Sequence, residues 1–252
     1  MSLSITEIEA ELYRLTTKAQ QKDILLRLLG GLAVWIHCPN TRQAMEVREY
    51  KDLDFLTDKD GGQRLEKFFY EAGYLPNRQL NTLNGDRRQI YFHPQGELQV
   101  DIFIGAFEMC HRIAIGERLR LEPITVPLAE LFLTKAQIVQ INRKDVLDIC
   151  CLLAEHEVGS SDQDMINLDQ LCRYCSVDWG LFTTVTDNLQ KTRSLLLMNE
   201  LNFNPPAAQI IVERLNGILS ALDSADKSLA WKIRAKIGRK MRWYEEVEEV
   251  QR

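Results

Sequence analysis

The spacing of apolar residues changes along the 252-residue chain, and this pattern predicts the elements. Apolar positions three and four residues apart predict helices at 5–20, 32–38, 61–74, 127–141 and 143–157. Short apolar runs between turn residues predict strands at 23–29, 52–57 and 98–105, and Asn84-Gly85 predicts a hairpin over 81–93. Beyond residue 158, helical spacing dominates and predicts helices at 168–176, 179–201, 206–222 and 228–250.

This order of elements predicts an α+β fold. We expect a first domain at residues 1–157, where strand and helix patterns alternate, and a helical C-terminal domain at residues 158–252. The segment HEVGSSDQDMIN, residues 156–167, is polar and rich in Gly, Ser and Asp. It is therefore predicted to be the linker or loop between the two parts.

Composition and charge narrow the class of protein. No apolar run approaches the roughly 18 residues that span a bilayer, and residues 1–20 carry no signal-sequence pattern, so we expect a soluble, cytoplasmic protein without a membrane partner. Six cysteines in a chain of this size do not suggest a disulfide framework. A net charge of −5 argues against a general nucleic-acid coat, although a local basic patch is compatible with it.

Two aspartates lie one residue apart in the apolar segment KDLDFLTD, residues 51–58. A strand points residues i and i+2 to the same side, so Asp52 and Asp54 are expected side by side. Asp101 is a third acid in an apolar strand, and three converging carboxylates would repel one another. Mg²⁺ or Mn²⁺ would relieve the repulsion and bind phosphate oxygens as well. The alternative is that all three lie on solvated strand faces.

Gly30 and Gly31 lie between a predicted strand and a predicted helix. The absence of Cβ atoms allows a phosphate to approach the backbone, and the start of the helix offers unpaired N–H groups to an anion. A glycine pair alone is also common in ordinary turns. The pair followed by D-x-D, and later by a third strand aspartate, is a more specific pattern.

These motifs resemble the nucleotidyltransferase superfamily that includes DNA polymerase β. The match is closest to bacterial nucleotidyltransferase-like proteins distantly similar to abortive-infection toxins. The resemblance covers about residues 25–157, through the segments GGLAVWIHCP, REYKDLDFLT, VDIFIGAFEMCHRI and PLAELFLTKAQIVQINRKDVLDI. It implies the nucleotidyltransferase fold, a mixed sheet flanked by helices.

The resemblance also implies roles for individual residues. Gly30 and Gly31 would hold the triphosphate of an NTP. The catalytic residues, which would also be the ligands of Mg²⁺ or Mn²⁺, are Asp52, Asp54 and Asp101. Basic residues that match positions near the nucleotide are Arg48, Lys135 and Lys144. The chain departs from many active members, which place serine after the first glycine, so the phosphate contact here would be made by backbone alone.

The function predicted on this basis is metal-dependent transfer of NMP from an NTP to a hydroxyl acceptor, with release of pyrophosphate. RNA such as tRNA, a protein or a small molecule could supply the hydroxyl. The alternative is a catalytically weak relative that binds nucleotide or acts in a toxin–antitoxin interaction. A cognate protein or a second copy of the chain would then be its partner.

A basic stretch, KSLAWKIRAKIGRKMRWYEE, lies near the end of the sequence. Along one side of the predicted helix it places Lys232, Lys236, Arg239 and Lys240. This side could track the phosphates of an RNA acceptor. The alternative is a solvated helix whose aromatic residues pack in the core.

The cysteines and histidines are interpreted as structural. Cys172 and Cys175 form C-x-x-C, but a zinc site needs a second ligand pair, and none follows at suitable spacing. His37 and His111 each neighbour a cysteine, an arrangement without ligand geometry. No Ser-His-Asp or Cys-His pattern supports a hydrolase.

Overall fold

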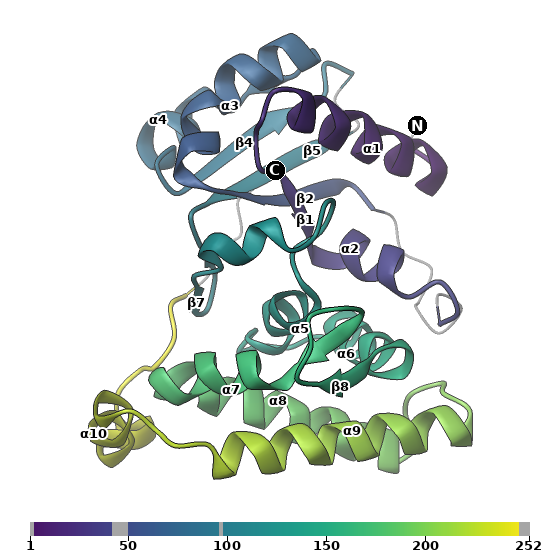
Figure 1. The fold of residues 1–252 in the computed structure, drawn as a ribbon, viewed down its shortest axis with the longest axis vertical. Helices are drawn as coiled ribbons and strands as arrows, with labels where there is room; N and C mark the ends of the chain where they lie inside the picture. The colour runs from purple at the N-terminus through teal and green to yellow at the C-terminus, as the bar shows by residue number, and fades with distance from the viewer. Residues whose placement is uncertain (1–2, 42–49, 96–97, 247–252) are drawn as a thin grey trace. The chain divides into compact units, whose positions relative to one another are not determined.

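The computed structural model describes residues 3–41, 50–95 and 98–246, which fold into two compact units (Figure 1). The first unit takes its described residues from Met1–Ala33, Val47–Phe107 and Ala114–Pro127. The second takes its described residues from Val34–Glu46, Glu108–Ile113 and Leu128–Arg252. Each unit is therefore built from separate stretches of the sequence.

A mixed sheet is the framework of the first unit, and in the described residues it has five strands. In spatial order they are β1 (Arg27–Leu29), β2 (Asp52–Thr57), β5 (Gln99–Ile104), β4 (Arg88–Phe92) and β3 (Leu75–Pro76). Strands β2 and β5 run parallel, and the other neighbouring pairs are antiparallel. The α+β class expected from the sequence is confirmed, and β2 has the predicted bounds.

The helices of the first unit begin and end at recognisable sequence signals. They are α1 (Ile5–Gln21), the first residues of α2 (Gly30–His37), α3 (Lys59–Ala72), α4 (Arg78–Asn84) and the 3₁₀ helix η2 (Gly116–Arg120). Ser4 and Glu7 form a capping box at α1. Asp58 caps α3, which ends at Gly73 with φ +90°.

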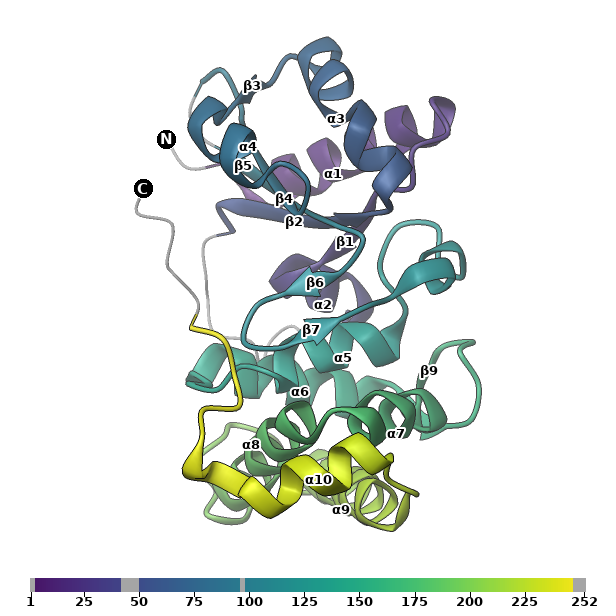
Figure 2. The same ribbon diagram turned by 90° about the vertical axis from the view of Figure 1, so that its left-hand side faces the viewer.

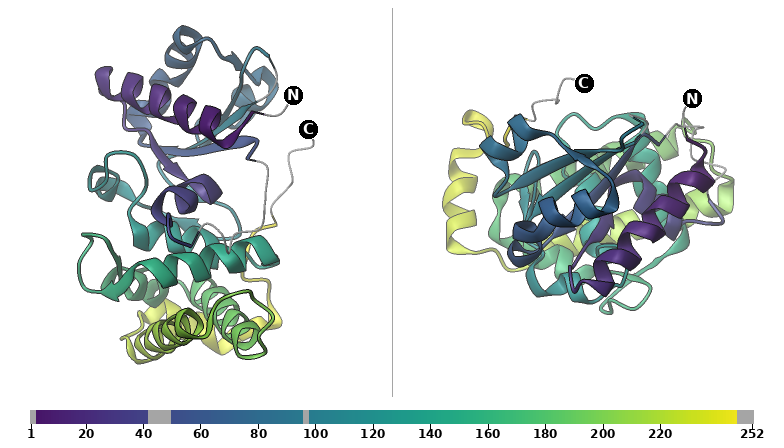
Figure 3. Two further views of the ribbon diagram at one scale, coloured as in Figure 1. Left: turned by 90° about the vertical axis from the view of Figure 1, so that its right-hand side faces the viewer. Right: turned by 90° about the horizontal axis from the view of Figure 1, so that it is seen from above.

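One face of the sheet is apolar and covered by helices. Register and strand alternation place Leu53 and Phe55 of β2 on this face together with Ile102 of β5, and all three are fully buried. In the view from above, α1 and α3 both lie over the sheet (Figure 3). Phe69 of α3 stacks on Tyr91 of β4 with ring centroids 4.3 Å apart. The alternate residues of β2 and β5 consequently point to the other face.

The segment predicted as a hairpin over 81–93 is a helix followed by one strand, so that prediction is wrong. Gly85 has φ −67°, not the positive φ that a two-residue Asn-Gly turn requires. The Asn77 side chain caps α4. The Asn81 amide hydrogen-bonds both backbone groups of Ile90 in β4. These contacts favour a helix docked against β4.

The second unit is mainly helical, and Figure 2 shows its C-terminal helices α7 to α10. Its helices are α5 (Leu128–Ala136), α6 (Arg143–Glu155), α7 (Leu168–Val177), α8 (Trp179–Leu197), α9 (Pro205–Ser224), α10 (Leu229–Ile237) and the 3₁₀ helix η3 (Gly238–Lys240). The described residues also contain two small two-stranded sheets, β6 (Phe107–Glu108) with β7 (Arg112–Ile113), and β8 (Glu157–Gly159) with β9 (Met165–Asn167).

The division into units differs from the boundary expected between residues 157 and 158. Helices α5 and α6 belong to the second unit, together with the C-terminal helices. The segment 156–167, expected as a linker or loop, contains the parallel strands β8 and β9. Helix α5 is shorter than predicted because the Asn188 amide donates to the carbonyls of Ala136 and Ile138, which ends the helix there.

A buried charge cluster joins α5 to α6. Lys135 Nζ lies 3.0 Å from Asp148 Oδ2 and 3.4 Å from Asp145 Oδ1. The side chains of Lys135, Asp148 and Asp145 are 12%, 1% and 11% exposed, respectively, so these ions are largely removed from water. Burying ions costs free energy that only close pairing offsets. Lys135 is therefore the counter-ion of two carboxylates inside this unit.

Lys135→Met tests this structural role. The substitution leaves two buried carboxylates without this cation, so we expect the free energy of unfolding to fall by about 3 kcal/mol at neutral pH. Urea denaturation measures the change. The neighbouring Lys144 is exposed, and Lys144→Met should change stability by no more than about 0.5 kcal/mol. Unchanged stability of Lys135→Met with weaker NTP binding would instead support the phosphate role expected from the sequence.

Candidate functional site

Three acidic residues share the face of the sheet opposite α1 and α3. Asp54 of β2 lies directly across from Asp101 of β5, and Asp52 lies across from Gln99. Neighbouring strands are about 4.8 Å apart, and residues in register point to the same side. The register therefore places the three acids on one face of two adjacent strands, while their expected convergence on a metal stays a prediction.

Arg88, which was not predicted as a site residue, makes an ion pair with Asp101. Strand β4 pairs antiparallel with β5, and the register places Arg88 opposite Phe103, on the face that carries Asp101. Arg88 Nε lies 2.8 Å from Asp101 Oδ1 and 3.1 Å from Oδ2, and Nη2 also donates to Oδ2. Both carboxylate oxygens of Asp101 therefore accept hydrogen bonds from one guanidinium group.

The surroundings of this pair stabilise its charged form. The side chain of Asp101 is 6% exposed and that of Arg88 is 27% exposed. Hydrogen bonding to Asp101 raises the pKa of Arg88 above its ordinary value, and the negative charges of Asp101 and Asp54 raise it further. The guanidinium carbon also lies 5.2 Å from the centre of the Phe103 ring. Arg88 is thus a permanent cation beside two aspartates.

Gly30, the first residue of α2, is packed against Asp54. Its φ is +78°, a region that other residues rarely adopt. A Cβ built on Gly30 would collide with Asp54 Oδ2. The pairing of Leu29 with Asp54 brings the glycine to this position. Glycine is required here both by backbone conformation and by the close approach of a carboxylate.

The carboxylates fit a divalent cation only in part. Among the residues that the structure describes, no three His, Cys, Asp or Glu side chains are arranged to hold a metal ion. Both oxygens of Asp101 are turned to Arg88. Magnesium is often held by one or two carboxylates together with substrate phosphates, and Asp52 and Asp54 suit that use. The three acids therefore fit a cation held by Asp52 and Asp54, and Asp101 could become a further ligand only after its ion pair with Arg88 breaks.

Of the basic residues expected near the nucleotide, the structure describes Lys135 and Lys144. Arg48 lies outside the described residues. Lys135 and Lys144 belong to the second unit, where Lys135 is buried against Asp145 and Asp148. Their expected roles at a phosphate stay predictions.

The basic stretch near residue 240 is not one helix. Helix α10 stops before Gly238, which has φ +60°. Lys232, Lys236, Arg239 and Lys240 are all exposed, and Arg239 also makes a 2.7 Å ion pair with Asp187. The lysines are consequently the more available charges for a phosphate ligand.

The structural interpretation of cysteines and histidines agrees with their surroundings in the fold. All six cysteines lie among the described residues and are free thiols. Burial raises the pKa of Cys175, which makes it an unreactive core residue. His111 is buried, and its Nε2 lies 2.8 Å from Thr184 Oγ1.

None of the helices in the described part of the chain has the length and apolar character needed to cross a membrane.

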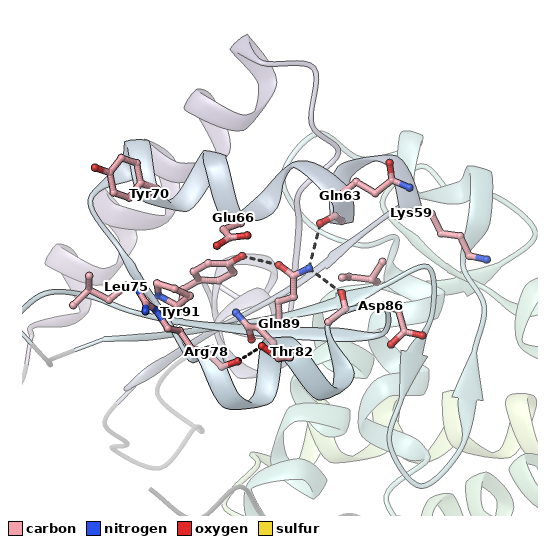
Figure 4. Close-up of a pocket in the computed structure, with 15 residues that line it drawn as sticks. Lys59, Gln63, Glu66, Tyr70, Leu75, Arg78, Thr82, Asp86, Gln89 and Tyr91 are labelled. Carbon is pink, nitrogen blue, oxygen red and sulfur yellow. Dashed lines mark hydrogen bonds between the residues drawn. The ribbon is translucent and has the colours of Figure 1, made fainter.

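A pocket of about 730 Å³ lies on the helix-covered face, away from the three acids (Figure 4). It is lined by α3, α4 and β4, and its floor includes Gln89 and Tyr91. Gln89 Nε2 donates to the carbonyls of Gly62 and Gly85, and its Oε1 accepts from the Tyr91 hydroxyl. Because none of Asp52, Asp54 and Asp101 lines the pocket, it does not add to the carboxylate site.

Comparisons with known proteins give structural similarity only. Neither protein-family models nor curated proteins match the sequence. The chain is similar in structure to an antigenic nucleotidyltransferase-like protein from Paracoccidioides brasiliensis, with 16% identity, a TM-score of 0.42, and coverage of 91% of this chain and 98% of that one. It is also similar to JHP933 from Helicobacter pylori, with 16% identity, a TM-score of 0.39, and coverage of 95% and 100%. Both TM-scores are low, so the function proposed below rests on the sheet and its side chains.

Gly30→Ala tests the contact between the glycine and Asp54. A side chain at positive φ costs about 1–2 kcal/mol, and the collision with Asp54 adds to this cost. We expect a loss of at least that much in the free energy of unfolding, measured by urea denaturation. As a control, Gly217→Ala within α9 adds a Cβ with no atom within 4 Å, and should raise stability by about 0.5–1 kcal/mol. Equal effects of the two substitutions would contradict the close approach at Gly30.

Proposed function

We propose that this chain is a nucleotidyltransferase that moves NMP from an NTP to a hydroxyl acceptor. The observation that carries the proposal is the placement of Asp52, Asp54 and Asp101 on one face of two adjacent parallel strands, with Gly30 packed against Asp54. Carboxylates grouped in this way beside a glycine at the start of a helix suit a phosphate-bound divalent cation. The resemblance of the sequence to nucleotidyltransferases supports the same reaction.

Each residue would contribute a distinct function. Gly30 and Gly31 would let the triphosphate approach the backbone at the N-terminus of α2. Asp52 and Asp54 would hold Mg²⁺ or Mn²⁺, which when bound neutralises phosphate charge and activates an oxygen nucleophile. Asp101, next to Asp54, would orient the acceptor hydroxyl. The hydroxyl oxygen attacks the α-phosphorus and gives up its proton to solvent, the bond between the α-phosphorus and the bridging oxygen of the β-phosphate breaks, and pyrophosphate leaves with that oxygen.

A second candidate function is nucleotide binding without efficient transfer. The observation that favours it is the ion pair of Asp101 with Arg88, which occupies one of the three carboxylates. A protein of this kind would act through a bound nucleotide, or through a cognate partner in a toxin–antitoxin pair. The two functions differ in whether a phosphoryl group is transferred.

Asp54→Asn tests the cation and the nucleotide together. With Mn²⁺ and an NTP each at about 100 times its dissociation constant, the wild type should gain about 2.7 kcal/mol per ligand, seen as a higher melting temperature. The variant should lose most of this gain, because it lacks one of the two proposed ligands. Asp86→Asn, an exposed acid in the same unit, is the matched control and should respond like the wild type. Identical responses of the Asp54 and Asp86 variants would exclude the site.

Labelled nucleotides separate transfer from binding. Incubation of the protein and total RNA with NTP labelled at the α-phosphate should label an acceptor, whereas label at the γ-phosphate should leave with pyrophosphate. Gel separation distinguishes RNA from protein as the acceptor. If NTP binds but no RNA, protein or small-molecule acceptor is labelled, the second candidate function is favoured.

An RNA acceptor predicts a specific effect of the basic stretch. Replacing Lys232, Lys236, Arg239 and Lys240 with Ala should weaken RNA binding at low salt and reduce the salt slope by about one for each phosphate that the variant no longer neutralises. The lysines should account for most of the change, because Arg239 is paired with Asp187. NTP binding should stay as in the wild type. A salt titration identical to that of the wild type would exclude this surface as an RNA site.

A further inference from the structure

We propose that Arg88 is an exchangeable counter-ion that couples nucleotide binding to cation binding. Without nucleotide it neutralises Asp101. When an NTP binds, its phosphate takes the guanidinium, and Asp101 becomes available to a divalent cation beside Asp52 and Asp54. The inference rests on the proposed function and adds a residue and an order of events to it.

The first step is that Arg88 and a cation compete for the same carboxylate. Both oxygens of Asp101 accept hydrogen bonds from the guanidinium, at 2.8 Å for Nε to Oδ1 and 3.1 Å for Nε to Oδ2. The carboxylate is 6% exposed, so water screens little of its charge. A divalent ion placed on Asp101 would meet a fixed positive charge within hydrogen-bonding distance of its ligand. The ion pair therefore disfavours metal on Asp101.

The second step is that Asp101 needs one of the two cations. Asp54 lies in register with Asp101 on the adjacent strand, and its charge helps to raise the pKa of Arg88. If Arg88 left without replacement, the largely buried Asp101 carboxylate would lose the guanidinium that pairs with both of its oxygens, beside the Asp54 carboxylate. A divalent cation can take the place of the guanidinium in this role. Departure of Arg88 and arrival of the cation are thus favourable together and unfavourable separately.

The third step is that a phosphate can draw Arg88 away. The Arg88 side chain is 27% exposed, whereas that of Asp101 is only 6% exposed, so Arg88 is the member of the pair that a ligand from solvent meets first. A guanidinium binds phosphate and carboxylate with the same forked geometry, so phosphate is a suitable alternative partner. An NTP that brings both phosphates and a bound cation supplies replacements for both members of the pair. Coupling of this kind is reciprocal, so the cation should also tighten NTP binding.

Arg88→Met is the decisive variant. It frees Asp101 for a cation, so we expect Mn²⁺ to bind about tenfold more tightly than to the wild type when no nucleotide is present. Titration of free Mn²⁺ by electron paramagnetic resonance measures this affinity. The variant should melt at a lower temperature without Mn²⁺, and Mn²⁺ should raise its melting temperature more than that of the wild type. Metal-free NTP should bind it more weakly, because the phosphate loses a guanidinium.

Three further variants guard against a merely unstable protein. Arg87→Met removes the same charge from the preceding residue, whose side chain is 74% exposed, and should leave Mn²⁺ affinity unchanged. The double variant Arg88→Met, Asp101→Asn removes the carboxylate together with its counter-ion and should recover stability while losing the enhanced Mn²⁺ binding. Arg88→Lys keeps the charge without the fork and should shift Mn²⁺ affinity in the same direction by a smaller factor, which provides a test if Arg88→Met does not fold.

The outcomes separate this inference from the proposed function. If the wild type binds NTP with Mn²⁺ but Arg88→Met and Arg88→Lys have the same Mn²⁺ affinity as the wild type, the ion pair is structural and the inference is wrong, while the proposed function stands. If neither Mn²⁺ nor NTP binds the wild type or any variant, the proposed function fails and the inference fails with it. Tighter Mn²⁺ binding in Arg88→Met that Asp101→Asn abolishes supports the exchange.

Discussion

The ion pair between Arg88 and Asp101 is the interaction on which the arrangement of the carboxylate face depends. Strands β2 and β5 run in parallel with Asp54 and Asp101 at the same level, so two anions are neighbours across the ladder. Such a pair is unfavourable in a poorly solvated place unless a positive charge lies close to it. Strand β4 supplies that charge because its antiparallel register on β5 places Arg88 on the same face. The order of the strands therefore determines the electrostatics of the site, because it places Arg88 of β4 next to Asp101 of β5.

Local patterns in the sequence predicted the features that depend on neighbours in the chain. The alternation in DLDFLT fixed the bounds of β2, and it placed Asp52 and Asp54 on one side. Arg88 was missed because its partner is set by the register between two strands, which no local pattern encodes. The Asn84-Gly85 pair also suggested a hairpin, whereas Asn77 and Asn81 stabilise a helix through a cap and through hydrogen bonds with β4. Interactions between residues distant in the sequence decided both outcomes.

Two basic residues that look alike in the sequence differ in their surroundings. Lys135 and Arg88 are both cations, and only the first was expected to reach a phosphate. The structure places Lys135 between Asp145 and Asp148 of the following helix, with a side chain 12% exposed. Arg88 has a more exposed side chain and lies beside the acids of the candidate site. Exposure and neighbouring charge, not position in a motif, make Arg88 the better candidate for contact with a nucleotide.

The choice of arginine over lysine at position 88 determines what the site can respond to. A lysine in a low-dielectric setting can lose its proton, so a lysine–aspartate pair can be discharged by pH. The guanidinium of Arg88 keeps its charge, and hydrogen bonding to Asp101 raises its pKa further. Loss of a proton by Arg88 therefore offers no route to release Asp101 in the neutral range, whereas the proposed exchange of ions would. An anion able to accept the guanidinium fork and a cation able to replace it are the two halves of a metal-bound nucleoside triphosphate. In the proposed exchange, the chemistry of this one side chain would make the carboxylate face selective for that ligand.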